Sequence, residues 1–484
     1  MCIWVLDLES PCSRALNDEC APRVVYELGH QPFSIASPWA QLEEAGFEVH
    51  GIDASLDPVD DSSIARAGLV AISVPMHTAL RLGVEIARRA RRVNPSAHIC
   101  MFGLYASLNA RELLGSVADS LIGGEFETAL VELAGKLAHG DTLGARGSTD
   151  VLERLPFVRS RRDRLPPLTR YAHLIGPEPG EVRLVGYAEA SRGCLHQCLH
   201  CPITPVYGGR FFVVPRAIVL SDIDQQIAAG ARHITFGDPD FFNGIGHSMA
   251  IARALHAAHP EVTFDITVKV EHILEHKDYL VELAGLGCIF LVSAIESLSD
   301  RVLEELEKGH TGAEVLEAVR ITREAGIALR PSFVSFTPWA TIGDFIDLCD
   351  FVLRDLIDHV DPIQLAVRLL IPPGSALLRH DQPRPWLREL DPEAFGYRWE
   401  HQDPRMDALH AKVIAIVEEA TRRKRDAAAT IEAIRSAAYE TACLALPDAT
   451  TDRRARQFVP KLSEPWFCCS EPNVAQITQV RQVQ

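Results

Sequence analysis

Short apolar runs alternate with amphipathic helical segments along most of this 484-residue chain. The alternation occupies residues 1–140, is lost in the Gly-, Arg- and Pro-rich stretch 141–182, and resumes over 183–375. Strands that alternate with helices pair in parallel, because each crossover helix returns the chain to the same end of the sheet. We therefore predict two parallel α/β domains joined by a linker and followed by a different C-terminal region, 376–484.

The expected strands of the two domains are Cys2–Leu6, Glu48–Ile52, Leu69–Val74, His98–Phe102, Ser120–Ile122, Leu184–Ala188, His233–Phe236, Thr263–Val268, Ile289–Ala294, Ala328–Ser335 and Ile363–Leu370. Helices fall between them. The C-terminal region is expected to form two helices, Pro404–Arg425 and Ala427–Leu444, before a tail that contains Cys468 and Cys469.

Composition excludes several classes of protein. Lys plus Arg number 48 against 65 Asp plus Glu, a formal net charge of −17, which disfavours nucleic acid and anionic membranes as partners. No apolar run has the length of a bilayer span, and the N-terminus has no basic leader, so we expect a cytoplasmic protein. Its 12 cysteines then suit a reducing compartment better than a disulfide framework.

Three of these cysteines, Cys194, Cys198 and Cys201, have the spacing CxxxCxxC just after an expected strand. Three thiolates on one short loop can hold three irons of a 4Fe–4S cluster and leave the fourth iron open to a chelating ligand. The alternatives are a zinc site completed by His196 or His200, or three unrelated thiols.

This loop resembles that of the radical S-adenosylmethionine (SAM) superfamily. The resemblance implies a partial (βα)6 TIM barrel over 183–375, in which SAM binds the open iron and is cleaved reductively to a 5′-deoxyadenosyl radical. It also implies an electron donor such as flavodoxin or ferredoxin. His200 stands where many members have an aromatic residue.

The resemblance also implies SAM-binding residues after the strands. Gly237, Asp238 and Asp240 lie where the family has a Gly-Gly-Glu motif for the SAM amino group, although here the motif is altered and an Asp-Pro-Asp turn is the alternative. Glu296 matches the ribose-binding position, since a carboxylate can accept hydrogen bonds from both ribose hydroxyls.

Three basic residues complete the expected cofactor site. Lys269 follows the third barrel strand, and Arg330 and Arg368 lie within the fifth and sixth. A buried Arg needs an anionic partner, which is either the SAM carboxylate or a structural carboxylate.

The N-terminal domain resembles the Rossmann-like, cobalamin-binding-type domain that precedes many radical SAM domains, notably over Gly123–Thr128. It lacks the Asp-x-His-x-x-Gly pattern that supplies an axial histidine to cobalt. Cobalamin is therefore possible but not expected to be required, and a retained structural domain is an equal alternative.

The tail sequence Cys468-Cys469-Ser470-Glu471-Pro472 resembles a subfamily named for a Cys-Cys-Ala-Glu-Pro tail. A disulfide between neighbouring cysteines is strained, so reduced thiols are expected. The resemblance extends to pathways that build carbon–arsenic bonds, and it implies that Cys468 and Cys469 hold a thiophilic atom.

Our preferred hypothesis is a radical SAM enzyme that forms a carbon–heteroatom bond, by preference carbon–arsenic, on a small-molecule substrate held by this pair, such as a trivalent arsenic species. The first alternative is a cobalamin-dependent radical SAM methyltransferase. The second is a non-catalytic metal-binding protein with zinc in the cysteine triad.

Overall fold

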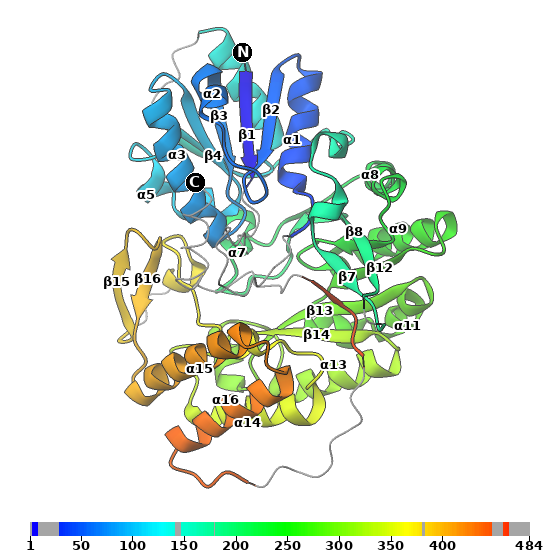
Figure 1. The fold of residues 1–484 in the computed structure, drawn as a ribbon, viewed down its shortest axis with the longest axis vertical. Coiled ribbons are helices and arrows are strands. Elements are labelled where there is room, and N and C mark those ends of the chain that lie inside the picture. Colours follow the sequence, from blue (N-terminus) through cyan, green and yellow to red (C-terminus); the bar gives the residue numbers. More distant parts are fainter. Residues whose placement is uncertain are drawn as a thin grey trace.

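The computed structural model describes residues 2–7, 29–140, 147–178, 180–379, 383–447 and 458–463. An N-terminal parallel sheet, a curled half-barrel and C-terminal helices follow one another along the chain, which confirms the predicted fold class (Figure 1). None of the helices in these ranges combines the length and hydropathy that a membrane span requires.

The N-terminal sheet is entirely parallel, with the strand order β2-β1-β3-β4-β5-β6 of a doubly wound fold. Its strands are β1 Cys2–Asp7, β2 Glu48–Asp53, β3 Ala67–Ser73, β4 His98–Phe102, β5 Ser120–Gly124 and β6 Gly147–Val151. Helices α1 (Phe33–Glu44) and α6 (Glu127–Ala138) cover one face. The other face packs against α2 (Asp61–Arg66), α3 (His77–Val93), α4 (Leu104–Leu108) and α5 (Ala110–Leu113).

The segment 141–182 was expected to be a linker, but its described part belongs to both sheets. Strand β6 extends the N-terminal sheet, and β7 (His173–Ile175) pairs antiparallel with β8 (Val182–Ala188). Arg162 is buried and forms an ion pair with Asp222 at 2.9 Å. The segment therefore connects the two domains through strand pairing and this ion pair.

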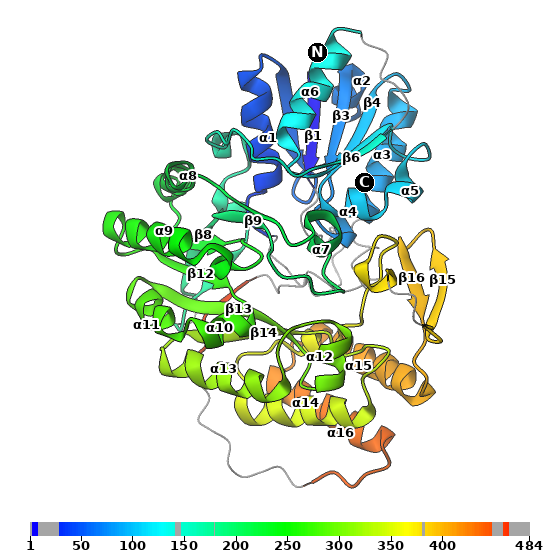
Figure 2. The same ribbon diagram turned by 180° about the vertical axis from the view of Figure 1, so that it is seen from behind.

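The half-barrel contains parallel strands β8, β11 (His233–Phe236), β12 (Thr263–Thr267), β13 (Cys288–Glu296) and β14 (Ala328–Phe333). Its outer layer consists of α8 Arg216–Ala228, α9 Ile245–Ala258, α10 Val270–Glu275, α11 Lys277–Gly285, α12 Asp300–Glu305, α13 Gly312–Glu324 and α14 Ile342–Asp355 (Figure 2). Strand β17 (Lys461–Leu462) pairs with β7 at the edge of this sheet.

The prediction of a sixth barrel strand over Ile363–Leu370 is wrong. Residues 362–366 form the 3-10 turn η4, and pairing is reduced to a single parallel bridge between Phe336 and Arg368. The cause is local: the Asp361 side chain accepts a hydrogen bond from the Ile363 amide, and Pro362 begins the turn. The Gln364 side-chain oxygen accepts a hydrogen bond from the Phe333 amide, which would otherwise pair with a sixth strand.

The C-terminal region packs on the half-barrel. Helices α15 (Pro404–Arg422) and α16 (Ala427–Thr441) share the hydrophobic core of the half-barrel, and Arg435 and Tyr439 both contact Asp350 of α14. A hairpin of β15 (Leu387–Asp391) and β16 (Gly396–Trp399) precedes them.

Candidate functional site

The three-cysteine loop leaves the half-barrel between two short strands. Strand β9 (Ser191–Gly193) pairs with β10 (Phe211–Val213), and helix α7 (Ile203–Tyr207) lies between them in the chain. Gly193 has φ +74°, and a Cβ there would lie 2.5 Å from the Arg210 carbonyl oxygen, so only glycine fits this turn. None of the three loop cysteines forms a disulfide with a described residue, and Cys198 is buried while Cys194 and Cys201 are half-buried.

Both histidines of the loop face carboxylates from other elements, Glu296 at the end of β13 and Glu271 in α10. His200 Nε2 lies 3.0 Å from Glu296 Oε1, and His196 Nδ1 lies 3.3 Å from Glu271 Oε2. The three sulfurs of the loop fit a group that takes three thiolates and leaves one position to another ligand.

Glu296 ends β13 at the mouth of the half-barrel. It has φ +68°, which is unusual for a residue other than glycine, and its side chain is buried. Burial alone would raise the pKa of this carboxyl, but Lys308 and the His200 contact lower it to about 2. An ionised carboxylate thus adjoins the cysteine loop, where the sequence predicted a ribose ligand.

Asp238 is turned toward the base of the loop. Its carboxylate accepts hydrogen bonds from the Ala190 amide at 2.9 Å and the Ser191 hydroxyl at 2.6 Å. Burial raises the pKa of Asp238 to about 7 in spite of these bonds. Gly237 packs tightly as well, since a Cβ there would lie 1.9 Å from the Tyr187 hydroxyl oxygen. Asp238 therefore orients β9.

Asp240 and Lys269 belong to a polar cluster beside the loop. Asp240 Oδ2 lies 2.8 Å from His272 Nδ1 and 3.5 Å from His196 Nε2. Lys269 Nζ lies 2.5 Å from Glu271 Oε2 and 3.2 Å from His196 Nδ1. Ligand atoms of His196, Asp240 and His272 are all within 4.8 Å of one another, close enough to hold a cation.

The two arginines predicted to bind the SAM carboxylate lie apart from this group. Arg368 donates to Asp407 at 2.8 Å and to the Trp399 carbonyl at 2.7 Å, and its guanidinium stacks on the Trp399 ring. The structural ion pair thus accounts for Arg368. Arg330 lines a cavity on the inner face of the half-barrel.

Arg192, which sequence reasoning missed, joins the cysteine loop to the N-terminal sheet. Its guanidinium contacts Glu127 at 2.7 Å, Glu189 at 2.8 Å and Glu125 at 3.4 Å. The Tyr207 hydroxyl donates to Glu125 at 2.9 Å. Glu125 and Glu127 belong to the stretch Gly123–Thr128 that was singled out in the sequence. The sequence feature that could have indicated their partner is the arginine two residues before Cys194.

Cys468 and Cys469 lie outside the described residues. The last described segment, 458–463, includes β17, and Lys461, Leu462 and Ser463 line the same cavity as Arg330.

Parallel strands that lead into a three-thiol loop at their carboxyl ends are the arrangement of an α/β enzyme with a soft metal centre. Residues 189–352, in the central part of the chain, match the model of the Radical SAM superfamily. The 4Fe–4S cluster and SAM predicted from the sequence are the cofactors that accompany this assignment.

The chain is 23% identical over 190 residues to a putative methylthiotransferase of Methanocaldococcus jannaschii, a match that covers 36% of this chain and 40% of that relative. The chain thus spans less than half the length of this curated relative.

Two solved structures share the fold across both domains. The radical SAM methyltransferase TsrM of Kitasatospora setae, with cobalamin and a 4Fe–4S cluster bound, has a TM-score of 0.61, with 14% identity and coverage of 91% of this chain and 99% of that one. The cobalamin-dependent SAM radical enzyme OxsB, with aqua-cobalamin bound, has a TM-score of 0.62 at 14% identity, covering 87% and 67%. At these identities the likeness concerns the fold.

Proposed function

We propose that this chain is a cobalamin-binding radical SAM enzyme that transfers a methyl group of SAM to a small substrate held in the half-barrel. The observation that carries the proposal is the buried connection between Arg192 and the carboxylates of Glu125 and Glu127. It holds the carboxyl edge of the N-terminal sheet against the loop that bears the three cysteines. Ligands of open parallel sheets bind at that edge.

In this proposal Cys194, Cys198 and Cys201 hold the 4Fe–4S cluster, which with bound SAM supplies reductive cleavage or methyl donation. Asp238 keeps the loop in place through Ser191. Glu296 accepts hydrogen bonds from the SAM ribose, and the contact of His200 with Glu296 couples this interaction to the loop. Asp240 and Lys269 remain candidates for the amino and carboxylate groups of SAM.

The N-terminal domain offers a place for cobalamin. Ser73 ends β3 on the face that packs against α1 and α6, because Leu69 and Ala71 of the same strand face those helices. The Ser73 and Thr128 hydroxyl oxygens are both buried and have no hydrogen-bond partner among the described residues. Two such hydroxyls fit a polar ligand such as the nucleotide tail of cobalamin, which when bound supplies a methyl carrier.

Cobalamin retention tests this proposal. Protein incubated with hydroxocobalamin and then desalted should retain about one equivalent, read from its visible spectrum. Ser73→Val and Thr128→Val should weaken retention at least tenfold, whereas Thr441→Val, a matched change on α16, should not. Failure of the wild-type chain to retain cobalamin would remove the methyltransferase proposal, and methyl transfer without added cobalamin would restrict the domain to a structural role.

A second candidate is carbon–heteroatom bond formation at Cys468 and Cys469, the preferred hypothesis from the sequence. The observation in its favour is the position of β17, because Ser463 lines the half-barrel cavity and Cys468 is five residues further on, a reach of at most about 17 Å. Cys468→Ser and Cys469→Ser should then abolish product formation from an arsenite substrate while SAM cleavage survives. Full product yield in both variants would eliminate this candidate.

A further inference from the structure

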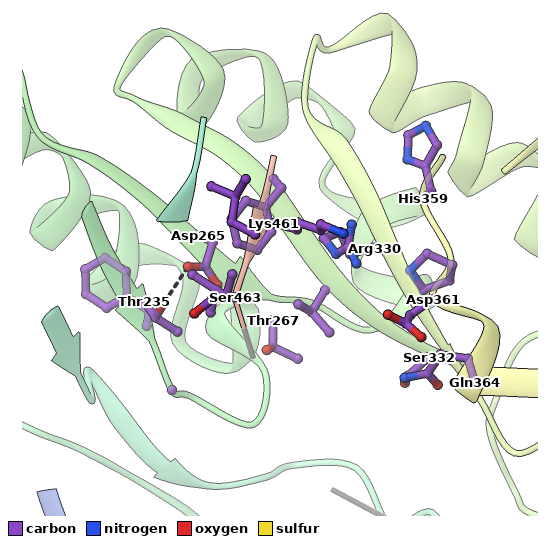
Figure 3. A pocket seen from close by; sticks show the side chains of 17 residues that line it. Thr235, Asp265, Thr267, Arg330, Ser332, His359, Asp361, Gln364, Lys461 and Ser463 are labelled. Atoms are coloured by element: carbon purple, nitrogen blue, oxygen red, sulfur yellow. Dashed lines mark hydrogen bonds between the residues drawn. The ribbon is translucent and has the colours of Figure 1, made fainter. Parts of the chain in front are cut away.

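The inner face of the half-barrel encloses a cavity of about 180 Å³ (Figure 3). Thr235, Asp265, Thr267, Arg330 and Ser332 contribute side chains from neighbouring strands, and they alternate along those strands with residues that pack against the outer helices. His359, Asp361 and Gln364 close one side, and β17 closes another. The volume is below the roughly 300 Å³ of pockets for drug-sized ligands, so the cavity suits a small molecule.

Arg330 differs from three other buried or half-buried arginines. Arg162, Arg192 and Arg368 each donate to a carboxylate at 3.0 Å or less. The Arg330 guanidinium, by contrast, forms no hydrogen bond and no ion pair within 4.0 Å with any residue that the structure describes. A half-buried guanidinium without a partner is partly desolvated at a cost, so its presence in a cavity wall points to an anionic ligand.

The surroundings of Arg330 leave room for that ligand. Burial lowers the pKa of Arg330, an effect that Asp361 opposes from a distance, and the Asp361 carboxylate already accepts from the Ile363 amide. Burial also lowers the pKa of His359, whose Nδ1 bonds the Leu329 carbonyl, so this imidazole is neutral near pH 7. The hydroxyls of Thr267 and Ser332 make no hydrogen bond to described residues. Arg330 and the more exposed Lys461 of β17 are thus the cationic side chains that line the cavity.

Arg330 lies deeper in the half-barrel than Glu296. In the parallel register Glu296 pairs with Phe333, three residues after Arg330 on β14. At a rise of about 3.3 Å per residue, Arg330 is about 10 Å below the strand end where Glu296 meets the cysteine loop. Its anion is therefore distinct from a group that contacts the loop.

Acidic side chains also line this cavity. Asp265 uses one carboxylate oxygen to accept from His233 and Thr235, and Asp361 stands beyond Arg330 (Figure 3). A lone anion would bring a negative charge close to these two carboxylates. A ligand with both a carboxylate and an ammonium group would satisfy Arg330 and offset the acidic side chains.

We propose that this cavity binds a small amino-acid-type substrate, with its carboxylate on Arg330 and its ammonium group toward Asp265. The planar guanidinium matches a carboxylate with two parallel hydrogen bonds, and Thr267 and Ser332 add hydroxyl donors. This inference rests on the proposed function, because it names the substrate class of the same half-barrel.

Ligand-detected NMR on the full chain with its cluster reconstituted, without reductant, tests the inference. Saturation transfer should be strong for L-alanine, weaker for propionate and absent for n-propylamine, three probes that share a small alkyl group. Arg330→Met should weaken L-alanine binding at least tenfold, and the exposed matched variant Arg354→Met should not change it. Thr267→Val with Ser332→Ala, which leaves the guanidinium in place, should weaken it about threefold to tenfold.

Two further readouts separate binding from structure and from the proposed function. Arg330→Met should raise the midpoint of thermal unfolding, whereas removal of an arginine with a purely structural role would lower it. Equal L-alanine binding in Arg330→Met, or displacement of L-alanine by S-adenosylhomocysteine, would overturn the inference. Probe binding does not depend on cobalamin, so failure of the methyltransferase proposal would be seen separately.

Discussion

Two arginines, Arg192 and Arg330, differ in whether carboxylates of the described residues neutralise their charge. Arg192 is enclosed by the carboxylates of Glu125, Glu127 and Glu189 and by three aromatic rings. Arg330 faces a cavity and has no such partner among the described residues. An arginine that is paired with carboxylates connects the elements that carry them. An arginine without such a partner can instead form its ion pair with a bound ligand.

Removing the satisfied arginine should have the largest effect on stability. Arg192→Met leaves Glu125, Glu127 and Glu189 without their cation, and uncompensated buried charges of this kind cost about 3–5 kcal/mol. Urea unfolding should report that loss together with reduced iron retention. A variant as stable as the wild type would mean that the connection between the domains does not depend on this cluster.

A second prediction concerns the turn that carries the cysteine loop. Gly193→Ala combines a φ of +74° with a Cβ that would lie 2.5 Å from a carbonyl oxygen, so it should cost about 2 kcal/mol and lower cluster content. Gly208 is the matched control, because it has φ +58° and no atom within 4 Å of an added Cβ. Gly208→Ala should cost about 1 kcal/mol and leave the cluster intact; equal effects on cluster content would show that crowding at Gly193 is unimportant.

The pH dependence of stability should reveal the excess of buried carboxylates. Burial raises the pKa of Glu125 to about 7 and that of Asp238 to about 7, so both retain protons in the folded state that the unfolded chain has lost. Their stabilisation is complete below their ordinary values near pH 4 and is lost as the pH rises to about 7, at up to about 1.4 kcal/mol per pH unit for each group.

Urea unfolding at intervals between pH 4.5 and 8 measures this slope. Glu125→Gln, which keeps a hydrogen-bonding side chain beside Tyr207 and Arg192, should remove about half of it. An unchanged slope in the variant would assign the pH dependence to other groups.

The smallest expected effect is a gain in stability, opposite in sign to the loss expected for Arg192→Met. Arg330→Met removes an unpaired, half-buried charge and should stabilise the protein by about 1 kcal/mol, as expected where binding is maintained at the cost of stability. Differential scanning calorimetry of the ligand-free protein measures it. Destabilisation would indicate that Arg330 has a structural partner after all and would remove the contrast with Arg192.

Periodicity and motif spacing predicted most of the fold because they are local. Strands β1–β5, β8 and β11–β14 and the helices Ile245–Ala258 and Ile342–Asp355 follow their hydrophobic patterns closely, whereas the sheet strands β6, β7 and β17 were not predicted. The sixth barrel strand failed because Asp361 and Pro362 impose a turn on an apolar run. A pattern of apolar residues cannot reveal a cap whose effect depends on one side chain.

The site was predictable where the residues are adjacent in the chain and unpredictable where they meet through the fold. The cysteine loop and Glu296 were identified from motifs, and the structure brings His200 to Glu296 across 96 residues. Two of the partners of Arg192, Glu127 and Glu125, lie 65 and 67 residues away in the N-terminal domain, and no local signal specifies that approach. The same holds for the separation of Arg330 from the loop, which depends on strand register.

Iron content and SAM turnover of the cysteine variants test the central claim most directly. Anaerobically reconstituted wild-type protein should contain about four irons and, once reduced, consume SAM. Cys194→Ala, Cys198→Ala and Cys201→Ala should each lose the cluster and this turnover, while Cys443→Ala, at an exposed free thiol, should retain both. Wild-type turnover in any of the three loop variants would contradict the assignment of a radical SAM centre to this loop.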